Sequence, residues 1–454
     1  MSSLKKNLFY RITEYEGFVR EEVFTQNKPS IDGYQYLPYY TFDALEEFIL
    51  ANRYSGKTEA GELLSLSVRR SVGKTITARN YVGVITMKDG TVIEVLPKIF
   101  SEVSGVDKSE RISRVKQIFL EMLQTLKTMP FKEFNYSNLE TKHMNMLEIF
   151  ISMFVTEANT LVKQGLKSTY NTIENNECFI KGKLDVMQNI KHNYANKERF
   201  YVRYDEFSIN RPENRLIKAT LHVLKQRSSE DRNKLNIIRL LALFESVEAS
   251  IDYEADFSKC VSNRSMLHYE KVLSWCKVFL LGNSFTAFAG SKIAFALLFP
   301  MEKVFESFIT AKIRRLIPND CKLLTQDTQY SLFDHPVRAF PLRPDIVAKY
   351  EKATVIFDTK WKLLSENMKY YGISQSDMYQ MYAYSIKYNA DKIVLLYPLP
   401  ESLRGKSISY NSDDGVRVDA SFIDLFRTDE SLLELISELT QSLQCPKYKV
   451  NTTI

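Results

Sequence analysis

The segments that decide the fold are Arg343-Pro344-Asp345-Ile346-Val347 and Val355-Ile356-Phe357-Asp358-Thr359-Lys360. Both are rich in strand-forming residues, and the turn-like Tyr350-Glu351-Lys352-Ala353 lies between them, so they predict two adjoining strands. Asp358 and Lys360 are two residues apart and therefore lie on one face of their strand. A charged residue at the end of a buried strand is costly unless it is paired or ligates a metal.

These residue types suit the metal-dependent cleavage of a phosphodiester. Carboxylates such as Asp345 and Asp358 are hard oxygen ligands for Mg²⁺, which stabilises charge on a phosphate and lowers the pKa of a bound water. Lys360 would orient or deprotonate that water, or stabilise the transition state. The alternative is a surface ion pair between Asp358 and Lys360, because Asp-x-Lys is a very common pattern.

A helix predicted over Met301–Ile317 offers a third carboxylate. Glu306 falls at the edge of the apolar stripe of this helix. It would either reach inward as a third metal ligand or remain an ordinary flanking residue. Glu302, one turn earlier, is the weaker candidate.

A second helix, predicted over Ser374–Tyr388, follows the two strands. Asp377, Gln380 and Tyr384 share one face of this helix. Gln380 and Tyr384 would position a phosphate or a base without adding charge. The alternative is an amphipathic helix that is merely rich in aromatic residues.

The chain as a whole predicts an α+β multidomain protein. Residues 1–105 form a β-rich amino-terminal domain with a helix near Phe42–Asn52, and Asp89-Gly90 makes a tight turn between two strands. Residues 106–298 have helical periodicity and predict a helical region, with a polar turn and short strand pair over Asn171–Lys183. Residues 299–454 alternate between strands and helices, which predicts a mixed α/β domain.

Composition limits the function less sharply. The chain has 454 residues and 61 Lys and Arg against 55 Asp and Glu, a net charge of +6 that is compatible with DNA binding but does not demonstrate it. The five cysteines show no Cys-x-x-Cys spacing, so we expect free, mostly buried thiols and no zinc cage. The amino terminus has no apolar signal segment and no window is long enough to span a bilayer, so we expect a cytoplasmic protein without a membrane partner.

Basic residues are frequent around the predicted site, with Tyr370 and Tyr371 beside them. They would follow a DNA backbone, or they form an ordinary solvated surface. These residues are Arg314, Arg315, Lys322, Arg338, Arg343, Lys360, Lys362 and Lys369.

Two Gly-Lys-Thr segments, Gly56–Thr58 and Gly73–Thr75, suggest a phosphate-binding loop only superficially. Such a loop needs a glycine five residues before the Gly-Lys, where this chain has Ala51 and Val68. We therefore interpret both segments as ordinary loops and expect no nucleotide site on this chain.

Together, Asp345, Asp358-Thr359-Lys360 and Gln380-x-x-x-Tyr384 resemble the PD-(D/E)xK (restriction-endonuclease-like) nucleases. More closely, the chain resembles the McrC family, the nuclease subunits of McrBC-type 5-methylcytosine restriction systems. Ile180–Leu184, Asp205–Lys218 and the block from Gly83 to Ile99 also resemble that family. The likeness covers most of residues 80–400, and Asp205–Lys218 is its most specific part, because generic PD-(D/E)xK nucleases lack it.

This resemblance implies a fold, a reaction and a partner. It implies a PD-(D/E)xK nuclease domain over residues 299–454, with metal ligands Asp345, Asp358 and Glu306 and with Lys360, Gln380 and Tyr384 in the site. It implies Mg²⁺ as cofactor, double-stranded DNA as substrate, and a McrB-like AAA+ GTPase partner that binds the GTP. The amino-terminal half would dock into the partner ring and stimulate GTP hydrolysis.

Two other readings remain open at this point. The chain could be a non-catalytic assembly and GTPase-activating subunit with a vestigial site. It could also be a DNA-binding structural protein with an incidental Asp-x-Lys.

Overall fold

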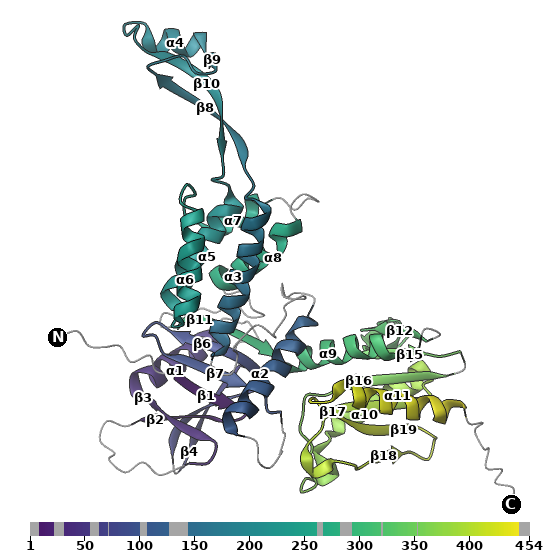
Figure 1. Cartoon of the computed structure of the whole chain (residues 1–454). Helices are drawn as coiled ribbons and strands as arrows, with labels where there is room; N and C mark the ends of the chain where they lie inside the picture. The colour runs from purple at the N-terminus through teal and green to yellow at the C-terminus, as the bar shows by residue number, and fades with distance from the viewer. Residues whose placement is uncertain are drawn as a thin grey trace, which may run out of the picture. The chain divides into compact units, whose positions relative to one another are not determined.

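The protein is described here by a computed structural model that covers residues 9–21, 31–54, 63–70, 72–99, 107–126, 144–260, 267–281, 293–318, 321–351 and 353–444. The chain divides into two compact units. The first joins Met1–His143 to Ala289–Ile454, and the second is Met144–Phe288 (Figure 1). The fold is mixed α+β, as predicted. The boundaries predicted at residues 105 and 298 stay predictions.

The first unit contains a four-stranded sheet in the order β1-β7-β6-β11. The predicted hairpin is confirmed, because β6 and β7 pair antiparallel across the Asp89-Gly90 turn. A Cβ at Gly83 would lie 2.0 Å from the Leu297 carbonyl oxygen, so only glycine lets β11 approach β6 this closely. The strands are β1 (Phe9–Thr13), β6 (Tyr81–Met87), β7 (Val92–Leu96) and β11 (Ile293–Pro300).

A second sheet in the same unit has the order β3-β2-β5-β4 and packs with helix α1 (Tyr39–Tyr54), which confirms the helix expected near Phe42–Asn52. The loop prediction for Gly73–Thr75 is wrong, because these residues begin strand β5 and pair with β4. Gly56–Thr58 lies outside the described residues. The strands are β2 (Gly17–Glu21), β3 (Tyr34–Pro38), β4 (Leu64–Arg69) and β5 (Gly73–Ala78).

The carboxy-terminal part of this unit is built on a six-stranded sheet in the order β12-β15-β16-β17-β19-β18. Strands β16, β17 and β19 run parallel, and helix α10 (Gln375–Tyr388) connects the first two. Residues alternate between the faces, so Val347, Ile356 and Ile393 share a core with Met381 of α10. The strands are β12 (Lys322–Thr325), β15 (Ile346–Lys349), β16 (Thr354–Thr359), β17 (Lys392–Pro398), β18 (Ile408–Asn411) and β19 (Arg417–Ile423).

Three more helices complete this unit. Strand β11 leads directly into α9 (Met301–Leu316), which contacts α2 (Lys108–Gln124), α11 (Thr428–Gln444) and β16. A small hairpin of β13 (Ser331–Phe333) and β14 (Ala339–Pro341) precedes β15. No helix of the described part of the chain is long and apolar enough to cross a lipid bilayer.

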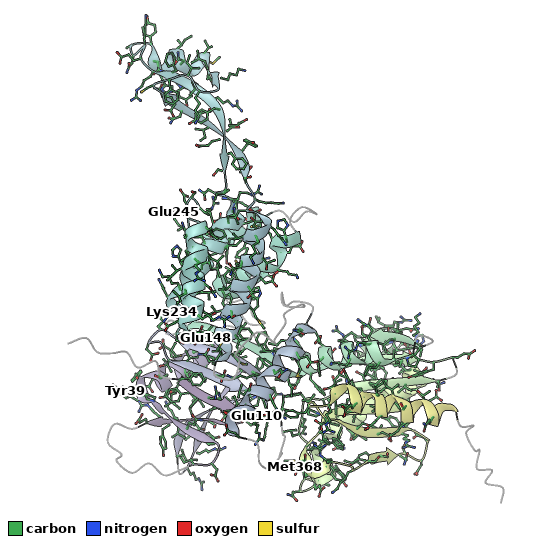
Figure 2. The ribbon with its side chains drawn as sticks, viewed as in Figure 1. Tyr39, Glu110, Glu148, Lys234, Glu245 and Met368 are labelled. Atoms are coloured by element: carbon green, nitrogen blue, oxygen red, sulfur yellow. The ribbon has the colours of Figure 1, made fainter. Side chains whose placement is uncertain are left out.

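The second unit has a helical core that confirms the helical periodicity of this region. Phe150 and Phe154 of α3 pack against Trp275 and Phe279 of α8, and all four side chains are buried. Glu148 of α3, labelled in Figure 2, accepts hydrogen bonds from the Ser229 backbone N–H at 2.6 Å and from other groups at the start of α6. The helices are α3 (Met146–Gln164), α5 (Pro212–Arg227), α6 (Asp231–Leu243), α7 (Tyr253–Lys259) and α8 (Leu267–Leu281).

An antiparallel hairpin arm extends from these helices (Figure 1). It consists of β8 (Thr169–Glu177), β10 (Phe200–Ser208), the short β9 (Lys183–Leu184) and α4 (Val186–Asn193). The prediction of a helical region is therefore incomplete. The short strand pair predicted over Asn171–Lys183 is also wrong, because the strand there is longer and pairs with a different segment. Strand β8 pairs with β10, more than twenty residues further along the chain.

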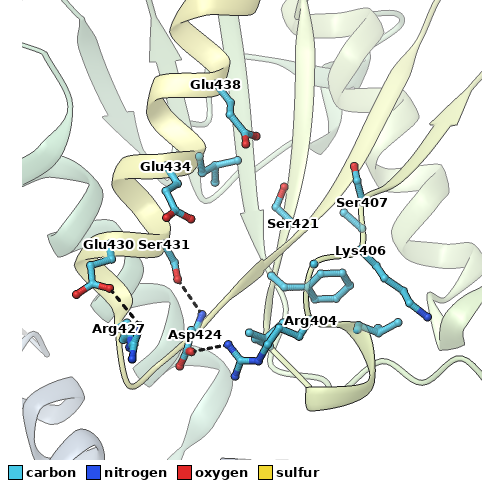
Figure 3. A pocket seen from close by; sticks show the side chains of 16 residues that line it. Arg404, Lys406, Ser407, Ser421, Asp424, Arg427, Glu430, Ser431, Glu434 and Glu438 are labelled. Atoms are coloured by element: carbon cyan, nitrogen blue, oxygen red, sulfur yellow. Dashed lines mark hydrogen bonds and ion pairs between the residues drawn. The ribbon is translucent and has the colours of Figure 1, made fainter.

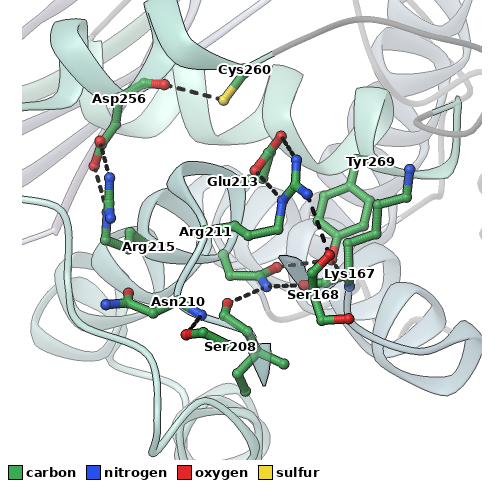
Figure 4. Close-up of polar contacts among 12 residues, drawn as sticks. Lys167, Ser168, Ser208, Asn210, Arg211, Glu213, Arg215, Asp256, Cys260 and Tyr269 are labelled. Atoms are coloured by element: carbon green, nitrogen blue, oxygen red, sulfur yellow. Dashed lines mark hydrogen bonds and ion pairs between the residues drawn. The ribbon is translucent and has the colours of Figure 1, made fainter. Parts of the chain in front are cut away.

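The base of the arm is closed by the block Asp205–Lys218, which singled out one family in the sequence (Figure 4). Asn214 donates hydrogen bonds to the carbonyl oxygens of Lys167 at 3.0 Å and Ile209 at 2.8 Å, which flank β8 and β10. The Tyr269 hydroxyl donates to Asn214 at 2.8 Å, and Arg215 binds Asp256 through two nitrogens. The specific polar residues of this block thus hold the two strands of the arm together where they leave the helices.

The tip of the arm has an unusual distribution of side chains. Helix α4 is fastened by amides: the buried Asn193 exchanges hydrogen bonds with Asn176, and Asn189 accepts from the Tyr201 backbone N–H, all at 2.8 Å. The apolar side chains of this tip are left exposed. They are Phe179, Ile180, Val186, Met187, Ile190 and Tyr194.

Candidate active site

Two strand ends bring the predicted carboxylates together. Strands β15 and β16 pair antiparallel with Ile346 opposite Phe357, so Asp345 and Asp358 lie at the same edge of the sheet. Val355, Ile356 and Phe357 are fully buried and hold β16 in the centre of the sheet. Asp358 and Lys360 extend the face to which Ile356 belongs, as the spacing predicts.

Asp345 is held by the residue that follows Asp358. Its Oδ2 accepts hydrogen bonds from the Thr359 backbone N–H and from the Thr359 hydroxyl, both at 2.8 Å. Burial raises the pKa of Asp345, and the Thr359 hydrogen bonds oppose that rise. The second residue of the Asp-Thr-Lys motif therefore fixes the orientation of the first carboxylate.

Asp358 and Lys360 form an ion pair, but not at the surface. The Lys360 Nζ lies 2.7 Å from the Asp358 Oδ2, and Asp358 is only 2 % exposed. Burial, followed by repulsion from Asp345, raises the pKa of Asp358 to about 7. Burial lowers the pKa of Lys360, but the charges of Asp358, Asp377 and Asp345 outweigh it and the pKa is raised overall. The surrounding carboxylates therefore favour the ammonium form of Lys360.

Helix α10 contributes the three residues that share its predicted face. Lys360 Nζ donates to the Gln380 Oε1 at 3.3 Å and lies 3.8 Å from Asp377. The Gln380 amide in turn donates to the Tyr384 hydroxyl at 2.6 Å. Tyr384 is buried, so its contact here is with Gln380 rather than with solvent. The structure thus places Gln380 next to Lys360 and Tyr384 behind Gln380.

Gln326 joins the third carboxylate to the first, and sequence reasoning missed it. Its side-chain amide donates to Glu306 and, at 3.3 Å, to the Asp345 Oδ1, while its backbone N–H donates to the Asp345 carbonyl oxygen. Gln326 has a positive φ of 52°, which is uncommon outside glycine and often marks a functional position. Nothing in the sequence around this glutamine, which follows a short strand, predicts its role. Glu302 instead accepts from Asn80 at 2.9 Å.

The electrostatics of this cluster fit a divalent cation. Burial and the charge of Asp345 raise the pKa of Glu306 to about 7, so these carboxyl groups repel one another in the absence of a counter-charge. Carboxylate oxygens are the donors that Mg²⁺ prefers. Within the described ranges, no three His, Cys, Asp or Glu side chains are already gathered as a ligand set. Asp345 and Asp358 would hold a metal directly, and Glu306 is separated from them by Gln326.

The predicted basic residues differ in their surroundings. Arg315 is 2.6 Å from Asp429, and Lys362 donates to the Gly372 carbonyl oxygen. Arg314, Lys322, Arg338 and Arg343 are exposed. Arg315 and Lys362 are exposed as well, but each already contacts another group of the chain.

A cavity of about 460 Å³ lies elsewhere in this unit, between α11, β19 and the loop that contains Arg404 (Figure 3). Arg404 pairs there with Asp424 at 3.2 Å. None of the predicted site residues lines this cavity. The candidate active site is the strand edge with Asp345 and Asp358, not the cavity.

Comparison with known proteins agrees with the family suggested by the sequence. A family model described as "McrBC 5-methylcytosine restriction system component" matches residues 76–398. The chain belongs to this family of restriction-system components. The comparison with curated proteins found no match to this chain.

The fold has a relative among solved structures. A chain in the refined half-complex of Thermococcus gammatolerans McrB AAA+ hexamers with bound McrC, from a tetradecameric assembly, superposes with a TM-score of 0.69. The two chains are 17 % identical, and the match covers 95 % of this chain and 100 % of that one. A cryo-EM structure of the Thermococcus gammatolerans McrBC complex has a TM-score of 0.47 at 18 % identity, over 68 % of this chain and 88 % of that one, which is too weak to bear on the fold.

Proposed function

We propose that this chain is the nuclease subunit of a McrBC-like restriction complex, a Mg²⁺-dependent DNA endonuclease with a PD-(D/E)xK domain. The observation that carries the proposal is the cluster of Asp345, Asp358 and Lys360 at neighbouring strand ends, in which Asp358 is buried and the other two are partly buried. A surface ion pair does not account for it, because Asp358 is buried beside a second carboxylate that repels it. A buried charge of this kind is costly unless it meets a ligand or a partner.

Each residue has a role that follows from its contacts. Asp345 and Asp358 would bind Mg²⁺, which supplies positive charge at the phosphate and lowers the pKa of the attacking water. Lys360 would stabilise the charge of the phosphate or act on the attacking water, because its Nζ is held beside Asp358 and Gln380. Gln380 orients Lys360, and Tyr384 orients Gln380. Glu306 would bind the metal directly or through a water molecule.

The proposed partner is a McrB-like AAA+ GTPase, which would bind GTP and bring double-stranded DNA to the site. The family assignment and the fold shared with a chain of the McrB–McrC assembly support this partner. The exposed apolar residues of the arm tip would dock into the partner ring, because α4 uses amides rather than these residues to hold itself in place. Docking there would stimulate GTP hydrolysis.

Docking is tested by placing a charge at the tip. Met187 and Ile190 are 81 % and 60 % exposed, so Met187→Asp with Ile190→Asp leaves the fold intact and lowers partner affinity and GTPase stimulation at least about tenfold. Ile251 is 98 % exposed in the same unit but outside the arm, and Ile251→Asp is the matched control. Equal affinity for both variants would exclude the tip as the docking site.

Nuclease activity is tested in the reconstituted complex with GTP and DNA that contains 5-methylcytosine. We expect phosphodiester cleavage in Mg²⁺ that ceases when EDTA removes the metal. GTP hydrolysis stimulated by this chain without cleavage, at any metal concentration, would instead indicate a GTPase-activating subunit with a vestigial site. DNA binding with neither activity would indicate a structural DNA-binding protein.

A further inference from the structure

A buried carboxylate lies outside the candidate active site and binds the residue next to its lysine. Glu14 follows strand β1 and is 1 % exposed. Its Oε1 and Oε2 each lie 3.0 Å from the Trp361 Nε1, which donates to them, and the Lys98 backbone N–H donates to Oε2 at 2.9 Å. One side chain therefore connects the ends of β1, β7 and β16.

Trp361 lies between the two segments that bring side chains to the site. It directly follows Lys360, whose backbone N–H donates to the Leu396 carbonyl oxygen at 2.9 Å. The Trp361 ring also packs against Phe305, the residue before Glu306, with 5.3 Å between the two ring centroids. Moving the Trp361 indole would therefore displace both Lys360 and the turn of α9 that carries Glu306.

The first turn of α9, one turn before Phe305 and Glu306, is attached to the amino-terminal sheets by a second route. Strand β11 of the first sheet passes into α9 without a loop, since Pro300 ends one and Met301 begins the other. The Met301 backbone N–H donates to the Asn80 carbonyl oxygen at 2.8 Å, and the Asn80 amide donates to Glu302 at 2.9 Å. The start of α9 is thus already fixed, and Glu14 fixes the segment opposite it.

The two donors that face Glu14 require an acceptor at this position, not merely a side chain that fills the space. Burial raises the pKa of Glu14 to about 7, so an ionised Glu14 is costly here, and its hydrogen bonds from Trp361 and Lys98 oppose that cost. A carboxylate offers two acceptor oxygens, which receive the indole and the Lys98 N–H groups. Glutamine offers one acceptor, and its amide nitrogen would face a donor.

We propose that Glu14 is a positioning residue of the nuclease site, which holds the Trp361 indole and thereby places Lys360 and Glu306 relative to the amino-terminal sheet. The inference rests on the proposed nuclease function. Glu14 touches neither metal nor substrate and acts only through Trp361. The amino-terminal sheet is then part of the active-site scaffold rather than a separate docking module.

The test uses the full chain in the reconstituted complex. Glu14→Gln lowers kcat for DNA cleavage about tenfold or more, because a small displacement of catalytic groups is enough for such a loss. The KM for DNA and the stimulation of GTP hydrolysis stay within twofold of wild type. Glu16→Gln is the matched control: Glu16 lies two residues away and accepts from the Thr13 backbone N–H at 2.7 Å, so its variant cleaves at the wild-type rate.

A spectroscopic measurement separates positioning from general loss of structure. The chain has two tryptophans, so in a Trp275→Phe background the fluorescence reports Trp361 alone. We expect Glu14→Gln to raise acrylamide quenching of Trp361 at least twofold, with Glu16→Gln unchanged. Trp361→Phe keeps a ring against Phe305 but removes the donor, so Glu14→Gln lowers kcat no further in that background.

The outcomes distinguish this proposal from the function on which it rests. If the wild-type complex cleaves DNA, any one of three results would overturn the positioning role alone. These are a fully active Glu14→Gln variant, unchanged quenching of Trp361 in that variant, and additive losses of kcat when Glu14→Gln is combined with Trp361→Phe. Absence of cleavage by the wild-type complex would overturn the proposed function and this proposal together.

Discussion

The side-chain amide of Gln326 lies 3.3 Å from the Oδ1 of Asp345 and donates to it. The same amide donates to Glu306, so a single neutral side chain bridges two carboxylates that repel each other. Its positive φ is the backbone cost of this position. Gln326 is therefore the residue that holds the third carboxylate at the site.

Substitution of Gln326 should weaken cleavage without affecting docking. Gln326→Ala releases Glu306 and one oxygen of Asp345, and we expect kcat to fall about tenfold to a hundredfold while GTPase stimulation is unchanged. Gln329→Ala, at an exposed position three residues later, is the control and should cleave normally. A fully active Gln326→Ala variant would remove Gln326 and Glu306 from the site.

The role of Lys360 is tested by comparing arginine with alanine at this position. If the ammonium stabilises charge, Lys360→Arg keeps part of the activity, whereas Lys360→Ala loses about a hundredfold or more, because arginine keeps the charge. A general base must lose a proton, which arginine does not do near neutral pH. Equal losses in single-turnover cleavage by the two variants would therefore favour the base.

Metal binding should depend on pH in a defined direction. Burial first, then Asp345, raises the pKa values of Asp358 and Glu306 to about 7, whereas unfolded carboxyl groups lose their protons near pH ~4. Between these two pKa values the folded metal-free chain binds more protons than the unfolded chain does. The contribution of these groups to the stability of the fold is therefore lost as the pH rises through this range. Mg²⁺ competes with the protons and should raise Tm more at pH 8 than at pH 5.

This dependence has a matched control in the same sheet. Asp419 forms a partly buried pair with Lys392 at 2.9 Å, and its pKa is lowered rather than raised. Asp419→Asn should keep the Mg²⁺-dependent rise in Tm, and Asp358→Asn should lose most of it. A Tm that responds equally to Mg²⁺ in both variants would place the metal elsewhere.

The hydrogen bonds of Asn214 at the base of the arm should limit the local separation of strands β8 and β10. Asn214→Ala leaves the partly buried carbonyl oxygens of Lys167 and Ile209 without this donor, which costs about 1–3 kcal/mol. Amide hydrogen exchange should become faster at the start of β8 and the end of β10. Asn233 is also buried in this unit but binds Glu148, so Asn233→Ala should leave exchange at the arm base unchanged.

Sequence patterns predicted the helices and strands in which buried apolar residues recur at regular spacing. The helices predicted over Met301–Ile317 and Ser374–Tyr388 agree with α9 and α10 to within one residue at each end, because each has a clear apolar face. The site residues predicted at neighbouring strand ends are neighbours in space, because antiparallel register brings Asp345 beside Asp358. Their catalytic roles stay predictions.

The features that sequence patterns missed have no regular spacing of apolar residues to mark them. Strand β8 is Thr-Tyr-Asn-Thr-Ile-Glu-Asn-Asn-Glu, and it forms through pairing with the distant β10 rather than through burial. Gln326 and Glu14 take their roles from contacts with residues 19 and 347 positions away. Neither backbone strain nor a long-range hydrogen bond leaves a local pattern in the residues.

Cleavage and GTP hydrolysis measured in one reaction test the central claim most directly. The reconstituted complex would be made with wild-type, Asp358→Asn and Asp419→Asn chains and supplied with GTP, Mg²⁺ and DNA that contains 5-methylcytosine. We predict that Asp358→Asn abolishes cleavage while stimulating GTP hydrolysis like wild type, and that Asp419→Asn retains both. Full cleavage by the Asp358→Asn complex would contradict the assignment of the active site.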